Sequence, residues 1–179
     1  MAKEIVTLLE SERVRESVFI KWSGRGAHVH IHQSSFSTGL LRRINPLDAA
    51  YAIVEYVNTK LRSKYVEIAA KHDTRELSVE NEMDLQRVFT CPLSLHRSLN
   101  LVAVCFPPDV LDDFNPDWAS LGRYRHWKDW DRFREAEVDD LAKKAYQAVG
   151  AYPIRTLSKT PERKRKTTAN MITRWLEKK

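Results

Sequence analysis

The sequence has few cysteines and no long apolar run. Cys91 and Cys105 are the only cysteines among 179 residues, which argues against a disulfide framework and a four-ligand zinc module. Both lie among apolar neighbours, so we expect two buried, reduced thiols. No stretch stays apolar for the roughly 20 residues that a membrane helix needs. Charges at Lys3 and Glu4 occupy positions where a signal peptide is apolar, and we therefore expect a soluble, cytoplasmic protein.

The composition fits one folded domain followed by a basic tail. Hydrophobic residues make up 42% of the chain, which is enough for a core, and the net charge of +6 favours polyanionic partners. We expect a domain over residues 1–157, then a basic linker and a C-terminal amphipathic helix over 158–179. Two interpretations suit the linker, a solvated segment or a contact with nucleic acid through its densest cations, Arg163, Lys164, Arg165 and Lys166.

The hydrophobic pattern mixes helices with strands. Helical spacing covers residues 2–13, 136–149 and a long segment that starts at Asn45-Pro46 and ends between 62 and 70. In that segment the expected buried residues are Ala50, Val54, Val57 and Leu61. Strand-like runs cover 18–22, 27–32, 88–91 and 99–106, the third of them expected to be buried. This order predicts an α+β fold in which helices flank a mixed sheet.

A glycine-rich turn leads into a strand with alternating histidines. Residues 23–26 read Ser-Gly-Arg-Gly, a flexible turn whose backbone N–H groups and arginine can approach a phosphate. Strand alternation then places His28, His30 and His32 on one face. Phosphate or nucleotide binding by the turn and His28 is one interpretation. A metal site of several imidazoles is another, although no carboxylate lies at a matching spacing. The polar face of an edge strand is the third.

A second polar group surrounds the apolar residues 88–91. Asp84 precedes them, and a turn with Ser94, His96 and Arg97 follows. The carboxylate can ligate a hard cation, and the three turn residues can contact phosphates. Taken alone, an aspartate in this position is also typical of a cap or a turn.

In this order, the two groups resemble motifs of the archaeo-eukaryotic primase superfamily, which includes the catalytic small subunit of DNA primase. Family members carry a Ser-Gly-x-Arg/Lys-Gly-x-His turn, which residues 23–28 match with one residue fewer. They also carry an Asp before a short strand and Pro-Gly-Ser-Leu-His after it. Asp84 and residues 92–96 match these features, with Leu93 in place of glycine. The resemblance extends from the first helix to about Trp118.

The resemblance implies the C-terminal part of a primase-like catalytic core. The implied activity is template-directed nucleotidyl transfer, the synthesis of primers on single-stranded nucleic acid in DNA replication or repair. His28 and Asp84 would be catalytic, with Asp84 as a ligand of Mg²⁺ or Mn²⁺. The residues implied to bind the nucleoside triphosphate are Ser23, Gly24, Arg25, His28, Ser94, His96 and Arg97.

One family motif has no counterpart in this sequence. Family members place two aspartates, one residue apart, on a strand before the Ser-Gly turn, but residues 1–22 contain no aspartate. The acidic pair could belong to a second polypeptide of a split enzyme, or the gene could be truncated at its start. Alternatively, the chain is a non-catalytic module that binds nucleotide or nucleic acid. A histidine-metal hydrolase remains a further alternative.

The stretch from Trp118 to Trp130 alternates aromatic and basic residues. Such a stretch can stack on bases while its cations contact the phosphate backbone. Acidic residues such as Asp129 dilute the basic character, which favours an aromatic cluster packed on the core with its charges outward.

Overall fold

The computed structural model describes residues 1–73, 78–81, 83 and 88–153. This part of the chain forms four α-helices and three β-strands, together with three short 3-10 segments. The elements are α1 (Ala2–Ser11), β1 (Val18–Trp22), β2 (Ala27–Ile31), η1 (Gln33–Ser35), α2 (Thr38–Leu41), α3 (Pro46–Lys71), β3 (Val104–Phe106), η2 (Pro108–Asp113), η3 (Pro116–Ala119) and α4 (Asp139–Val149). The predicted α+β class is confirmed.

The long helix α3 begins where its capping residues predict. The side chain of Asn45 accepts a hydrogen bond from the backbone N–H of Leu47, and Pro46 occupies the first turn. The helix continues to Lys71, one residue beyond the expected range. Its buried residues lie one position away from the expected face, because only Val57 and Leu61 of the four predicted residues are buried; the others are Ala49, Ala52, Ile53 and Tyr56.

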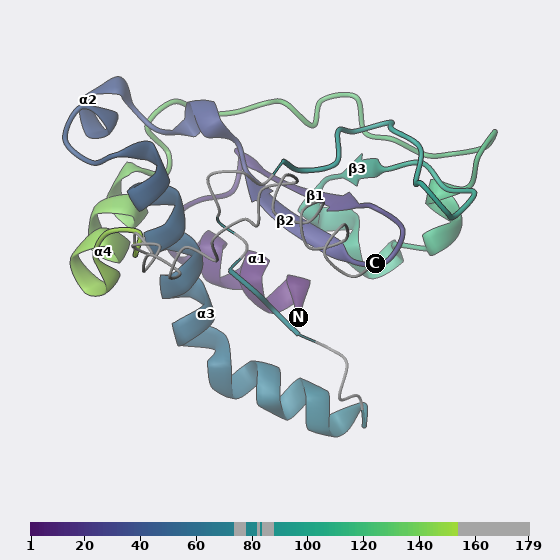
Figure 1. Cartoon of the computed structure of the whole chain (residues 1–179), viewed down its shortest axis with the longest axis horizontal. Coiled ribbons are helices and arrows are strands. Elements are labelled where there is room, and N and C mark those ends of the chain that lie inside the picture. The colour runs from purple at the N-terminus through teal and green to yellow at the C-terminus, as the bar shows by residue number, and fades with distance from the viewer. Residues whose placement is uncertain (74–77, 82, 84–87, 154–179) are drawn as a thin grey trace, which may run out of the picture.

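Helices α3 and α4 lie side by side, and α1 lies against the sheet (Figure 1). They enclose the largest cluster of buried apolar side chains, to which Leu9 of α1, Ile53 of α3 and Leu141 of α4 contribute. Glycine directly after the predicted helix 136–149 is expected to cap it, and the structure agrees: α4 ends at Val149, and Gly150 follows with a φ of 91°. No helix in the described ranges is long and apolar enough to cross a membrane.

The sheet is antiparallel throughout the described residues, in the order β2-β1-β3. The prediction of a mixed sheet is therefore wrong. β1 and β2 form a hairpin around the Ser-Gly-Arg-Gly turn, with Trp22 opposite Ala27. Successive side chains of β1 point to opposite faces of the sheet, and Val18 and Ile20 belong to apolar clusters with the helices, so they lie on the helix-covered face. Phe19 and Lys21 consequently lie on the other face.

Two further expectations are wrong, both in the segment before β3. Residues 88–91 form no strand, and the side chain of Val88 is 89% exposed. Cys91 is exposed, whereas Cys105 is buried on β3, and both are free thiols. Residues 88–91 instead contact the polar face of the sheet: the carbonyl of Thr90 accepts a hydrogen bond from Lys21 Nζ (2.8 Å). Apolar composition alone did not separate a segment that covers a sheet from a strand inside it.

Candidate nucleotide-binding site

The face of the sheet opposite the helices carries the predicted histidines. Register places His28 opposite Lys21 and His30 opposite Phe19, so all four side chains lie on this face. The ring of Phe89 lies edge-on to both imidazoles, with centroids 6.1 Å from His28 and 5.5 Å from His30. The histidine strand therefore borders a polar surface that residues 88–91 partly cover.

The Ser-Gly-Arg-Gly turn packs directly against the turn that contains His96. Gly24 has a φ of +112°, which side-chain-bearing residues rarely adopt. A Cβ added there would lie 3.1 Å from Cδ2 of His96 and 3.4 Å from methyl carbons of Leu99 and Leu101. Glycine is therefore required for both its backbone angle and its close approach. The fold thus brings together two motifs that are about 70 residues apart in sequence.

Backbone pairing holds His96 in place. Leu93 N–H donates to the carbonyl of Ala103 (2.7 Å), and His96 N–H donates to that of Leu101 (2.9 Å), so residues 93–103 form a small hairpin. At its tip, Nδ1 of His96 accepts hydrogen bonds from Ser98 and Leu99 N–H. Because Nδ1 is an acceptor, the neutral ring carries its proton on Nε2. His96 can therefore donate a hydrogen bond through Nε2.

The other predicted phosphate ligands lie on these same two turns. Arg25 is exposed in the first turn, and Ser23 Oγ lies 3.4 Å from His28 Nε2 at its base. Arg97 is exposed beside His96. Ser94 differs, because its hydroxyl donates to the carbonyl of Cys91 (2.7 Å) and so stabilises the hairpin. The two turns together present one guanidinium each and the imidazole of His96.

The imidazole rings of His30 and His32 are packed against aromatic side chains. The ring of His30 stacks on Phe19 (centroids 4.8 Å apart), and burial, followed by the charge of Lys21 and by His28, lowers its pKa to about 3. His32 stacks on Phe133, and its Nδ1 accepts the N–H of Ser34 at the start of η1. No group of three potential metal ligands occurs among the described residues. This arrangement does not support a site of three imidazoles.

The sequence analysis did not single out Lys21, which lies at the centre of this face. Its side chain is 3% exposed and lies directly opposite His28 on β2 and Cys105 on β3. Burial lowers its pKa, and the two thiols partly oppose that shift. Besides its bond to Thr90, the ammonium lies 5.4 Å from the centroid of Phe89. A buried lysine costs stability, which points to a functional role. The only sign of this residue in the sequence is a single lysine among the apolar residues of the predicted strand 18–22.

Two tryptophans of the aromatic-basic stretch, Trp118 and Trp130, are partly buried and pack on the core, as the packing interpretation predicts. Trp118 packs edge-on to Phe106 and Phe114, and Trp130 packs edge-on to Phe19. Arg125 covers the face of Trp118 at 4.7 Å. These indole rings are therefore not available to stack on bases.

The two edges of the sheet differ. β3 is covered, because Cys105 N–H donates to His126 Nδ1 and the Cys105 carbonyl accepts the N–H of Trp127. At the two ends of β2, the backbone hydrogen bonds from His32 N–H to the Ser17 carbonyl and from Ser23 N–H to the Gly26 carbonyl fix the pairing pattern. That pattern determines which backbone groups of β2 point toward β1. The N–H and carbonyl groups of Ala27, Val29 and Ile31 therefore point away from β1, and they make no hydrogen bond within the described residues.

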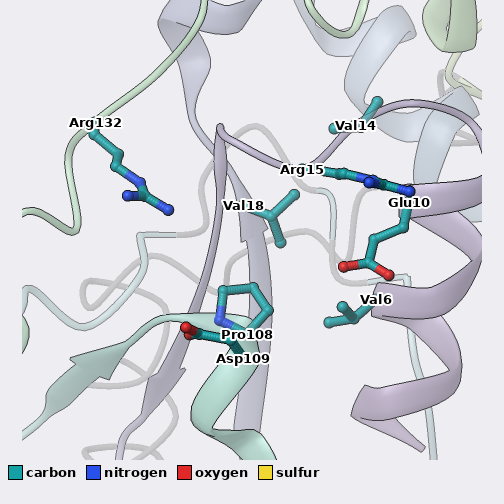
Figure 2. Close-up of a pocket in the computed structure, with 8 residues that line it drawn as sticks. All are labelled: Val6, Glu10, Val14, Arg15, Val18, Pro108, Asp109 and Arg132. Atoms are coloured by element: carbon teal, nitrogen blue, oxygen red, sulfur yellow. The ribbon is translucent and has the colours of Figure 1, made fainter.

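A separate depression lies between α1, the start of β1 and η2 (Figure 2). Glu10 and Asp109 contribute two carboxylates to its wall, and Arg15 and Arg132 contribute two guanidinium groups. The charges balance, so this depression offers no net charge for a phosphate. Its walls contain none of the residues predicted to bind nucleotide.

Comparisons with protein-family models, with curated proteins and with solved structures found no match for this chain. The interpretation of the site therefore depends on its residues and their geometry.

Several predicted site residues lie outside the described part of the chain. They are Asp84, the expected ligand of Mg²⁺ or Mn²⁺, and the basic residues Arg163, Lys164, Arg165 and Lys166. The described residues of the two turns supply imidazole, hydroxyl and guanidinium groups, whereas a divalent magnesium or manganese ion prefers carboxylate oxygens. The described residues alone do not fit such an ion, and we derive no step through it.

Proposed function

We propose that this chain binds the triphosphate of a nucleoside triphosphate for primase-type, template-directed nucleotidyl transfer, as one part of a split or incomplete catalytic core. The contact between Gly24 and His96 carries the proposal, because it joins the two turns that resemble primase motifs. Neither turn alone is specific. Their approach at van der Waals distance creates one surface with Arg25, Arg97 and the Nε2 of His96.

This surface suits a group that carries several negative charges. In nucleotidyl transfer a 3′-hydroxyl loses its proton to a base or to water, and its oxygen forms a bond to the α-phosphorus. The bond from that phosphorus to the bridging oxygen breaks, releasing pyrophosphate. Guanidinium groups and N–H donors stabilise the charge that develops on the departing pyrophosphate. Arg25 and His96 would bind the departing phosphates. His28, which lies beside Ser23, would orient the part of the nucleotide that lies against the Ser-Gly-Arg-Gly turn.

Replacement of Arg25 by alanine is expected to weaken ATP binding at least tenfold, because one charge-assisted hydrogen bond contributes roughly 1.5–3 kcal/mol. Titration calorimetry with ATP measures this, and inorganic triphosphate should compete with ATP. Arg43→Ala is the control, since Arg43 is also exposed and lies two residues after α2. Equal affinities for ATP in the two variants would refute the assignment of Arg25.

The second test asks whether primer synthesis needs carboxylates from another polypeptide. Because the described part of the site lacks a carboxylate cluster, we expect little primer synthesis by the chain alone with Mg²⁺ or Mn²⁺. Labelled oligonucleotides on a single-stranded template should appear after addition of a polypeptide that bears two aspartates on a strand. Asp84→Ala should abolish that synthesis. Among the described residues, nothing pairs with the backbone of Ala27, Val29 and Ile31, and this supports such a partner because open strand edges pair readily with added strands.

The alternative is a non-catalytic module that binds nucleotide or nucleic acid. The same absence of a carboxylate cluster among the described residues favours it. Template binding that falls steeply with salt, without synthesis in either condition, would decide for this alternative.

A further inference from the structure

The segments around the two turns are depleted in acidic residues. Residues 17–47, 88–108 and 118–128 contain no Asp or Glu, although the chain has 24 of them. Five of the six histidines also lie in these three segments. These three segments therefore contribute cations and no carboxylates to the surface that they form, and the exposed Asp117 and Asp129 lie just outside the third segment.

These segments are joined by backbone contacts into one surface. Leu101 forms a bridge with Ser120, and Val102 N–H donates to the carbonyl of Ala119 (2.8 Å). The loop of residues 120–125 thus runs beside the 93–103 hairpin, which itself packs on the Gly24 turn. In Figure 1 this loop follows η3, at the end of the molecule remote from α4. The surface is continuous with the proposed triphosphate site.

This surface also gathers exposed apolar side chains. Eight large hydrophobic side chains are exposed in the described part of the chain, and six of them lie here: Val88, Phe89, Leu93, Leu95, Leu121 and Tyr124. Tyr124 is 47% exposed and stands between the exposed residues Arg123 and Arg125. Arg97 lies exposed at the tip of the neighbouring hairpin. Aromatic and apolar groups between cations, without acids, are typical of surfaces that bind single-stranded nucleic acid.

We propose that residues Arg97, Arg123 and Tyr124 bind single-stranded nucleic acid, with the two guanidinium groups on phosphates and the phenol ring stacked on a base. We call this surface the rim. The proposal rests on the proposed function in one respect, since the bound strand would lie next to the triphosphate site. Arg125 contributes less, because its guanidinium already covers Trp118.

The test is fluorescence anisotropy with a labelled single-stranded oligodeoxynucleotide, using the full chain at several salt concentrations. Arg97→Ala with Arg123→Ala should weaken binding about tenfold and reduce the slope of log K against log salt by about 1.4, since each lost phosphate contact removes about 0.7. Tyr124→Ala should weaken binding about tenfold, and Tyr124→Phe should retain it, because stacking does not need the hydroxyl.

The matched control is Arg62→Ala with Lys71→Ala, which removes two exposed charges from α3. If this pair weakens binding as much as the rim pair, or if Tyr124→Ala has no effect, the rim is refuted as a nucleic-acid site. If polyglutamate binds as tightly as the oligodeoxynucleotide, the rim binds polyanions in general, and the proposal of a nucleic-acid site is refuted. ATP calorimetry on the same variants separates the two proposals. Arg123→Ala and Tyr124→Ala, whose residues lie outside the proposed triphosphate site, should bind ATP normally, and failure of the wild-type chain to bind ATP would overturn the proposed function while leaving the rim result intact.

Discussion

Gly24→Ala is expected to cost about 2 kcal/mol of folding stability and to weaken ATP binding at least tenfold. Two effects combine. The φ of +112° strains any residue with a Cβ by roughly 1–3 kcal/mol. The added methyl would also meet the ring of His96 at 3.1 Å, which is tighter than nine in ten real Cβ contacts. Either the turn or the His96 hairpin must move, and both contribute to the proposed triphosphate site.

The chain offers a close control for this substitution. Gly26 lies in the same turn, but a Cβ there would meet no atom within 4 Å and its φ needs no glycine. Gly26→Ala should therefore change stability by less than about 0.5 kcal/mol and leave ATP binding unchanged. Urea unfolding and ATP calorimetry compare the two variants. Similar behaviour of both would show that the contact between the turns has no role in nucleotide binding.

Local signals predicted the helices and the β1–β2 hairpin well. Asn45-Pro46 marked the start of α3 and Gly150 the end of α4, because capping depends on adjacent residues. The Ser-Gly-Arg-Gly sequence between two β-branched runs likewise marked the turn. The antiparallel pairing of β3 with β1 was not predicted, since it joins residues about 80 positions apart and nothing local records it.

In the candidate site, too, features set by adjacent residues were predictable and features set by distant contacts were not. The two motifs and their phosphate-binding residue types were visible in the sequence, and their contact was expected only by resemblance. Lys21 was missed, because burial of one lysine on a sheet depends on Thr90 and Phe89 folding over it. Residues 88–91 were wrongly predicted to form a strand, because a short apolar run has the same sequence pattern whether it pairs in a sheet or covers one. The roles of His30 and His32 were settled by Phe19 and Phe133, which lie far away in sequence or on another strand.

Glu137→Ala is expected to lower the free energy of unfolding by about 3 kcal/mol, because it removes the acceptor of several hydrogen bonds to a buried charge. The side chain of Glu137 is fully buried. Its carboxylate accepts the backbone N–H groups of Arg15 (2.8 Å), Glu16 (3.0 Å) and Ser17 (2.9 Å). These residues lead into β1, so Glu137 fastens the start of the sheet to the segment before α4.

The contribution of Glu137 should depend on pH. Burial alone would raise its pKa, but hydrogen bonds from the Ser17 hydroxyl and the three backbone N–H groups outweigh burial, and the pKa lies below the ordinary 4.5. A carboxyl group with a lower pKa in the folded state stabilises the fold fully above its unfolded pKa. That stabilisation is lost as the pH falls through the folded pKa. The difference between wild type and Glu137→Ala should therefore be constant near neutrality and shrink in acid.

Urea unfolding at pH 7 and at steps below pH 5 measures both effects. Glu135→Ala is the control, because Glu135 is exposed two positions away and its loss should change stability by less than about 0.5 kcal/mol. A Glu137→Ala variant as stable as Glu135→Ala would show that the three N–H groups do not need this carboxylate. A stability difference that grows in acid would contradict the lowered pKa, because protonation removes the charge that those N–H groups bind.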